Sequence, residues 1–185
     1  IMNRVSAIVC AYNESATLDQ VIQELLAIPL ISQIIVINDG STDNSASILN
    51  KYEQRVTVIT NDVNSGKGVS VARGLRVATE DTILLLDADI LNYTAKDLNL
   101  LTEPVLTSPY DFTIKIPDTG LFMKISVSGI RCYRKADLLP LIPALEKSTR
   151  YGLEFLLNKE FKNKRGTFVQ LTDYRHIKKF EKYSL

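Results

Sequence analysis

The sequence predicts a single α/β domain built on a mostly parallel sheet with helices on both faces. The first ninety residues alternate between strand-like and helix-like segments, as in parallel strands joined by crossover helices. Two of the strand-like segments, residues 34–38 and 82–87, are near-continuous runs of β-branched residues or leucine, which is typical of strands buried on both faces. The first helix-like segment has one apolar stripe that is suited to packing on a sheet.

The first half of the chain divides into elements in the order strand, helix, strand, helix, strand, helix, strand. We expect them at residues 5–10, 16–28, 34–38, 45–52, 56–60, 68–78 and 82–87. The stripe of the first helix follows the spacing i, i+3, i+4, i+7, i+8 and consists of Leu18, Val21, Ile22, Leu25 and Leu26. Pro29 ends this helix because a proline has no N–H to continue it.

The second half is predicted to be mixed rather than regularly wound. We expect helices at residues 95–106, 135–146 and 153–164, and extended segments at residues 112–116, 124–130 and 167–171. Residues 117–121 contain Asp118, Thr119 and Gly120 and indicate a loop. The chain has no repeat and no linker, so we expect one domain over residues 1–185.

Composition and charge favour a soluble globular domain. The 185 residues are 45% apolar and 23% charged, which is enough to bury a core, and the net charge of +1 gives no indication of nucleic-acid binding. No apolar run approaches the roughly 18 to 20 residues of a membrane span, and no leader-like segment opens the chain. Cys10 and Cys132 are too few for a disulfide framework, which favours the reducing cytoplasm.

Residues 159–182 are locally basic, with eight of the 22 basic residues against three acids. Two interpretations remain open. The stretch attracts a diphosphate or the inner face of an anionic membrane, or it is a solvated helix face.

Polar side chains follow all four strands of the first half, at residues 11–15, 38–43, 61–68 and 87–89. Ligands of open parallel sheets bind beyond the carboxyl ends of the strands. Helix caps and turns could explain Asn13, Ser15 or Asp43 one at a time. Four such segments at one edge of one sheet predict a ligand site there.

Asp87 and Asp89 follow the most apolar strand. In an extended chain both side chains would project to one side, roughly 7 Å apart. Such a pair can bracket Mg²⁺ or Mn²⁺, which prefer oxygen ligands and keep substrate phosphates in their shell. The sequence therefore predicts a divalent metal that holds a diphosphate.

Gly66, Lys67 and Gly68 are predicted to open a helix and to offer backbone N–H groups and one cation to a phosphate. A flexible turn is the alternative. The segment is neither a P-loop, which would need a glycine in place of Asn61, nor a dinucleotide fingerprint, which would need one in place of Val71.

Four segments, residues 5–18, 34–45, 64–74 and 83–89, resemble the successive motifs of family-2 glycosyltransferases. Residues 128–134 and 151–157 are similar to acceptor-side elements of the dolichyl-phosphate-sugar-synthase-like branch. The resemblance implies a Rossmann-like A-type glycosyltransferase domain, in which residues 1–90 bind the nucleotide sugar and residues 91–185 form the acceptor side. It also implies transfer of a sugar from a UDP- or GDP-sugar, with Mn²⁺ or Mg²⁺ as cofactor.

Carried over by position, the resemblance implies a donor site. Together with the glycine and lysine that open the third helix, the expected nucleotide-sugar contacts are Ala11, Tyr12, Asn13, Glu14, Asp39, Gly66, Lys67, Asp87, Ala88 and Asp89. Asp39 would face the base, and Asp87 and Asp89 would serve the ribose and the metal-bound diphosphate. Asn38 departs from the family pattern, in which a second aspartate is common, and leaves the base open.

Asp89 is the expected metal ligand, and His176 is expected to join it. The resemblance implies a metal-binding histidine near the C-terminal end, and an imidazole can complete the shell of Mn²⁺. The alternative is a surface histidine in the basic stretch.

Glu154 resembles the general base of this superfamily and completes an expected catalytic set with Asp87 and Asp89. It would take the proton of an alcohol acceptor, or position a lipid phosphate that is already an anion. Ser128, Gly129 and Arg131 are expected on the acceptor side, where Gly129 allows close approach and Arg131 offers a fork to phosphate or sugar oxygens. A structural ion pair is the alternative for Arg131.

The acceptor is left open between a lipid phosphate, a glycan and a small molecule. Two other functions remain. A non-catalytic nucleotide-sugar-binding module would keep the sheet and Asp39 but lose part of the catalytic set. A sugar-phosphate nucleotidyltransferase would need a loop rich in Gly and Arg after the first strand, where this chain has Ala11 and Tyr12.

Overall fold

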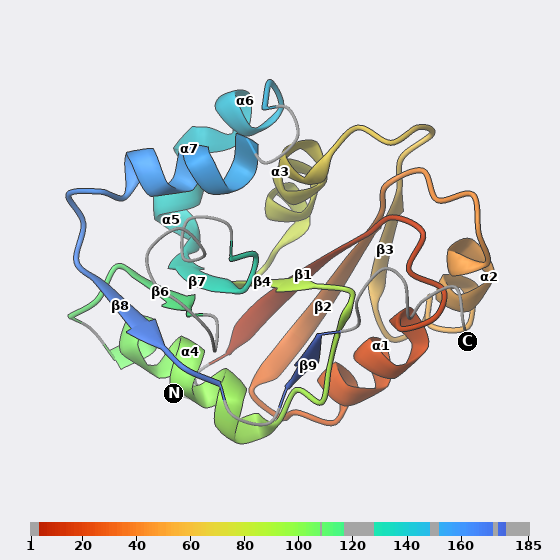
Figure 1. Cartoon of the computed structure of the whole chain (residues 1–185), viewed down its shortest axis with the longest axis horizontal. Helices are drawn as coiled ribbons and strands as arrows, with labels where there is room; N and C mark the ends of the chain where they lie inside the picture. Colours follow the sequence, from red (N-terminus) through yellow and green to blue (C-terminus); the bar gives the residue numbers. More distant parts are fainter. Residues whose placement is uncertain (1–3, 108, 117–127, 149–151, 172–173, 177–185) are drawn as a thin grey trace.

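The chain folds around one seven-stranded sheet (Figure 1). The computed structural model describes residues 4–107, 109–116, 128–148, 152–171 and 174–176. The sheet order is β3-β2-β1-β4-β7-β6-β8, and β5 and β9 form a separate two-stranded ribbon. The strands are β1 (Val5–Ala11), β2 (Ile31–Asn38), β3 (Thr57–Thr60), β4 (Thr82–Asp87), β5 (Ile90–Leu91), β6 (Phe112–Lys115), β7 (Arg131–Arg134), β8 (Gly166–Val169) and β9 (Arg175–His176).

Helices cover both faces of the sheet and make two cores. One core contains apolar residues of α1 (Leu18–Leu26), α2 (Ser45–Asn50) and α4 (Ala95–Thr107). The other contains residues of α3 (Lys67–Val77), α5 (Lys135–Leu138), α6 (Ile142–Leu145) and α7 (Gly152–Glu160), with the 3₁₀ turn η2 (Leu139–Leu141) between α5 and α6. Figure 1 shows these two groups of helices on opposite sides of the sheet.

The register brings the carboxyl ends of the central strands together. β1 runs parallel to both β2 and β4, with Ala11 opposite Asn38 and Cys10 opposite Asp87. The hydrogen bonds of the sheet therefore place the loops after β1, β2 and β4 at one edge. β7 is antiparallel to both β4 and β6, so the regular parallel winding stops after β4.

The first half of the fold confirms the predicted order of strands and helices. The stripe of α1 packs as expected, since Leu18, Val21, Ile22 and Leu25 are buried; Leu26 is only partly buried. The structure also contains the short strands β5 and β9, which were not predicted. Two-residue strands are too short to produce a recognisable pattern.

Two predictions for the second half were wrong. The single helix expected at residues 135–146 is divided into α5, η2 and α6, because Pro140 and Pro143 each lie at the start of a new short segment and cannot donate a helical hydrogen bond. The extended segment expected at 124–130 is not a strand over residues 128–130, and residues 117–127 lie outside the described part of the chain, as does the loop predicted at 117–121. The strand lies instead at β7.

Candidate active site

The loops after β1 and β2 are joined through Asn13. This residue has a φ of 57°, in the left-handed region that asparagine tolerates better than most residues. Its backbone N–H donates to Ser41 Oγ at 3.0 Å, and the N–H of Thr42 donates to Asn13 Oδ1 at 2.8 Å. These hydrogen bonds hold the loops after β1 and β2 together as one wall at the carboxyl end of the sheet.

Asp43 extends this wall. Its carboxylate accepts hydrogen bonds from the N–H groups of Ser15 at 3.0 Å and Ser45 at 2.9 Å, while Ser45 Oγ accepts one from the N–H of Glu14 at 3.1 Å. Burial by itself raises the pKa of Asp43, but hydrogen bonds from Ser45 and Ser15 outweigh it, so the net pKa is lowered. Tyr12, next to this network, leaves 45% of its surface exposed.

Asp39 is buried and organises the loop that leads into α3. Its Oδ1 accepts hydrogen bonds from Asn61 Nδ2 at 2.6 Å and the N–H of Ser65 at 2.9 Å, and its Oδ2 accepts one from the N–H of Gly66 at 2.8 Å. Gly66 has a φ of 92°, which favours glycine. Asp39 thus fixes the start of α3, and its predicted contact with a base stays a prediction.

Lys67 joins three elements at the strand edge. As the first residue of α3, it extends its Nζ to within 2.6 Å of Asp87 Oδ1 at the end of β4 and 3.2 Å of Glu154 Oε1 in the first turn of α7. Burial lowers the pKa of Lys67, but the charges of Asp87 and Glu154 raise it by more, so the net pKa is above the ordinary lysine value. The Glu154 side chain is only 6% exposed, whereas Lys67 and Asp87 are 30% and 27% exposed.

The Lys67 amine, predicted to contact a phosphate, therefore meets two carboxylates. One cation beside two anions leaves this cluster with a net negative charge, which attracts a further cation. The Cys10 thiol at the end of β1 is neutral at pH 7, because burial raises its pKa to about 12.

Gly129 packs directly against the cluster. A Cβ at this position would lie 2.3 Å from both carboxylate oxygens of Asp87 and 2.4 Å from Lys67 Nζ. Any side chain would push the pair apart. The close approach that was expected of Gly129 is made by these two residues.

Arg131 lies behind Gly129 and is only 1% exposed. Its Nε donates to the carbonyl oxygen of Ser128 at 2.5 Å, and its Nη1 donates to Asn158 Oδ1 at 2.7 Å and to Tyr133 Oη at 3.2 Å. The guanidinium thus ties the backbone around Gly129 to α7. This is a structural position rather than an exposed fork.

The chain turns immediately after Asp87, and this corrects the expected geometry of the aspartate pair. β4 ends at Asp87, and Ala88 and Asp89 form a turn, so the extended arrangement assumed for the two carboxylates does not occur. The turn is held by Thr17 Oγ1, which donates to the Ala88 carbonyl oxygen at 2.7 Å, and by Tyr93 Oη, which donates to that of Asp87 at 3.3 Å.

The ribbon of β5 and β9 brings the C-terminal part of the chain to this turn. His176 pairs with Ile90, the residue after Asp89, and Arg175 pairs with Leu91. The backbone of His176 therefore lies beside the aspartate with which it was predicted to bind a metal. The side chain of His176 is outside the described part of the structure.

The residues at the turn fit a hard divalent cation that takes part of its shell from substrate and water. Asp89 supplies oxygen donors at the turn, next to Asp87, which belongs to the net negative cluster with Lys67 and Glu154. Within the described ranges there is no group of three or more His, Cys, Asp and Glu side chains that could hold a metal by itself. This donor set is typical of Mg²⁺ or Mn²⁺ bound together with a diphosphate.

Three residues of the site were missed in the sequence. Asn158 lies four residues after Glu154, so both are on one face of α7, and this spacing could have indicated it. Thr17 and Tyr93 act through hydrogen bonds to backbone carbonyls of the Ala88 turn. Their sequence positions gave no signal, because these contacts depend on the tertiary structure.

Comparison with known proteins identifies the family. Residues 6–119 match the family model described as glycosyl transferase family 2. The chain is 39% identical over 89 residues to the uncharacterized glycosyltransferase YaiP of Escherichia coli, which covers 46% of this chain. It is 33% identical over 90 residues to the poly-β-1,6-N-acetyl-D-glucosamine synthase of Staphylococcus aureus, which covers 47% of this chain. The matched segment spans 22% of the length of each of these relatives.

Solved structures with the same fold include glucosyl-3-phosphoglycerate synthase from Mycobacterium tuberculosis. Its complex with phosphoglyceric acid superimposes with a TM-score of 0.76 at 21% identity, covering 96% of this chain and 73% of that one. Its complex with Mn²⁺, uridine diphosphate and phosphoglyceric acid has the same TM-score at 22% identity, covering 96% and 72%. No helix in the described ranges is long and apolar enough to cross a membrane. The narrower resemblance to the dolichyl-phosphate-sugar-synthase-like branch stays a prediction. The chain belongs to glycosyl transferase family 2 and has the A-type glycosyltransferase fold that the sequence predicted.

Proposed function

We propose that this domain transfers a sugar from a nucleotide-diphosphate sugar, held through a divalent metal, to an acceptor bound near Glu154. The observation that carries the proposal is the meeting of Lys67, Asp87 and Glu154 from α3, β4 and α7 at the carboxyl edge of the sheet. Two carboxylates and one ammonium group from distant parts of the sequence converge beside Gly129, which has no room for a side chain. A purely structural ion pair needs no such glycine.

The donor is proposed to lie over the loops after β1 and β2. The exposed ring of Tyr12 offers a surface for the nucleotide, next to Ala11, Asn13 and Glu14. Asp39 is proposed to fix the α3 loop and to face the base. We propose a UDP-sugar in the first instance, because the Mycobacterium tuberculosis synthase of the same fold was crystallised with uridine diphosphate and Mn²⁺.

Asp89 and His176 are proposed to hold the metal. The pairing of His176 with Ile90 supports this because it brings the histidine backbone to the Asp89 turn. A bound divalent cation would neutralise the charge that develops on the leaving diphosphate. Asp87 and Lys67 keep their own contact at one side of the turn and position the donor against the cluster.

Glu154 is proposed to act on the acceptor. Lys67 Nζ donates to Glu154 Oε1, which fixes the carboxylate on α7 while its second oxygen can accept the proton of an alcohol acceptor. If the acceptor is a lipid phosphate, Glu154 orients it and removes no proton. Ser128 and Gly129 would border this side, with Arg131 supporting them from behind.

The test is a thermal-shift panel of UDP, GDP, CDP and ADP, each with and without Mn²⁺. A ligand that binds only the folded state raises the midpoint of unfolding. At a free concentration a hundredfold above its dissociation constant, such a ligand adds about 2.7 kcal/mol to the free energy of unfolding. We expect the largest shift with UDP and Mn²⁺ together. If no diphosphate shifts the midpoint with or without metal, the donor site is refuted.

Binding alone does not establish transfer, so donor hydrolysis is the second measurement. UDP-glucose is incubated with the domain with and without Mn²⁺, and release of UDP is followed. We expect Mn²⁺-dependent release that falls by at least about tenfold in Glu154→Gln, because that change removes a proton acceptor. Binding of UDP with no release under any condition would favour a nucleotide-sugar-binding module.

A further inference from the structure

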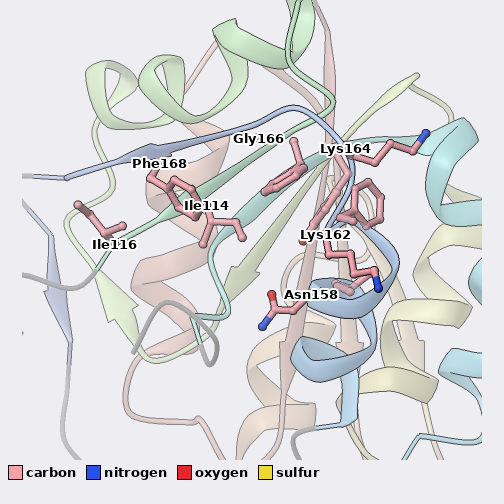
Figure 2. A pocket seen from close by; sticks show the side chains of 11 residues that line it. Ile114, Ile116, Asn158, Lys162, Lys164, Gly166 and Phe168 are labelled. Atoms are coloured by element: carbon pink, nitrogen blue, oxygen red, sulfur yellow. The ribbon is translucent and has the colours of Figure 1, made fainter. Parts of the chain in front are cut away.

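A cavity lies between α7 and the outer strands of the sheet, and it shares Asn158 with the candidate active site (Figure 2). Its volume is about 610 Å³, within the roughly 300–1,000 Å³ of small-molecule sites. The strand side consists mainly of Phe112, Ile114 and Ile116 of the β6 segment and Phe168 of β8. Leu157 and Phe161 contribute from α7 and the residues that follow it. We call this cavity the α7 cleft.

The apolar walls of the α7 cleft are fixed by packing. Phe112 stacks on Tyr133 with ring centroids 6.0 Å apart and meets Phe161 edge-on at 5.6 Å. Gly166 pairs with Phe112 in the sheet, and a Cβ at Gly166 would lie 2.0 Å from the Phe112 ring. The next residue on this face of β8, Phe168, leaves 50% of its surface exposed. The cleft is therefore preformed and presents aromatic surface to solvent.

The charged groups of the cleft are cations. Two lysines, Lys162 and Lys164, line it, and no acidic residue is among its lining residues, all of which are described. Lys164 Nζ is 3.1 Å from Asp137 Oδ1, and in Figure 2 its side chain extends away from the apolar side chains. Lys162 is exposed and forms no ion pair with a residue that the structure describes. A cation that has no ion-pair partner among the described residues thus lies at the rim of an apolar cavity.

We propose that the α7 cleft binds an amphipathic anion with one alkyl chain, such as an alkyl phosphate or a fatty acid. The chain would lie against Phe112, Ile114 and Phe168, and the anionic head group would lie at Lys162. An apolar lining with one cation at its edge matches a ligand with a long apolar part and a single charge, and does not match a nucleotide. The proposal is independent of the proposed sugar transfer.

The proposal is tested by calorimetric titration with dodecyl phosphate below its critical micelle concentration. We expect saturable binding of one molecule per chain. Octyl phosphate should bind at least about tenfold more weakly, because each methylene removed from apolar contact weakens binding by up to about fourfold. Inorganic phosphate should give no measurable heat, and dodecyl maltoside, with a neutral head group, should bind more weakly than dodecyl phosphate.

Two variants in the cleft have matched controls on α7. Phe168→Ser removes an apolar wall and Lys162→Glu reverses the charge at the rim, and each should weaken dodecyl phosphate binding at least about fivefold. Phe155→Ser and Lys159→Glu change exposed residues of α7 that do not line the cleft, and should bind as the unmodified chain does. Unfolding of each variant without ligand verifies that it is folded.

Two outcomes overturn the proposal. In the first, the folded, unmodified chain fails to bind dodecyl phosphate; if it then binds vesicles that contain phosphatidylglycerol, the cleft is part of a membrane-facing surface instead. In the second, the two control variants lose as much affinity as the cleft variants. The UDP and Mn²⁺ shift, measured on the same samples, tests the proposed function separately.

Discussion

At the scale of single residues, the positive charge of Lys67 offsets the repulsion between the carboxylates of Asp87 and Glu154. Its amine lies within hydrogen-bonding distance of both Asp87 and Glu154. The expectation of a phosphate contact came from its place at the start of a helix, and that place is correct. The sequence could not reveal the partners, because Glu154 is 87 residues further along the chain.

Replacing Lys67 with methionine should destabilise the domain by about 1–3 kcal/mol, since it leaves two largely buried acceptors without their donor. Urea unfolding of Lys67→Met at pH 7 measures this loss, and Lys67→Arg, which keeps the charge, should recover part of it. The folded pKa of Lys67 is raised, so its contribution is complete below the ordinary value of 10.5 and is lost only above it. The penalty should therefore be constant between about pH 6 and 9. Equal stability of Lys67→Met and the unmodified chain would contradict the assigned ion pairs.

Asp89 and His176 make a paired prediction about metal. Asp89→Asn should abolish the Mn²⁺-dependent part of the UDP thermal shift, because a neutral amide is a weaker ligand for a hard cation than a carboxylate. His176→Ala should raise the Mn²⁺ concentration that gives half of the shift while the fold stays intact. Asn50→Asp, on the exposed end of α2, serves as a charge-changing control. A normal Mn²⁺ titration of His176→Ala would return that residue to the surface-histidine interpretation.

At the scale of elements, α1 was predictable because its apolar spacing is regular and its burial depends on one face only. Leu25 is fully buried, whereas its neighbour Leu26 is only partly buried. β7 was not predictable in the same way. Its sequence begins and ends in arginine, which reads as solvent-exposed, yet Arg131 is held in the core by Ser128, Tyr133 and Asn158. Tertiary hydrogen bonds outweighed local polarity here.

The difference between the two leucines gives a measurable prediction. Leu25→Ala should cost about 2–5 kcal/mol of unfolding free energy, the range for truncating a fully buried leucine. Leu26→Ala should cost markedly less, because part of its side chain is already in contact with water. Urea unfolding of both variants tests the placement of the stripe. Equal losses would mean that α1 is rotated relative to its place in the structure.

At the scale of the whole molecule, the sheet interleaves early and late parts of the sequence. The strands before Asp89 follow the regular order that alternation predicts, and the loops after them supply most of the candidate donor site. The later strands do not, because β7 inserts between β4 and β6 and both of its neighbours are antiparallel to it. The hydrophobic pattern of each segment predicts a strand or a helix but not its neighbours in the sheet. The order of β6, β7 and β8 in the sheet was therefore known only from the structure.

This interleaving predicts that residues 4–116, which contain nearly all of the segment that matches the family, do not fold by themselves. Without β7 and β8, β6 loses both of its partners and β4 becomes an exposed edge. We expect this fragment to lack a cooperative urea transition by circular dichroism, under conditions in which the full chain has one. A cooperative transition in the fragment would show that the parallel half is stable without the later strands.

The ribbon of β5 and β9 has a consequence for how the protein is made. β5 follows directly on the Asp89 turn, and its partner is supplied by residues 175 and 176. Synthesis proceeds from the N-terminus, so the strands of the parallel half leave the ribosome long before β9 does. During translation β5 therefore has no partner until β9 emerges, and the ribbon beside the Asp89 turn forms only after almost all of the sequence shown here has been synthesised.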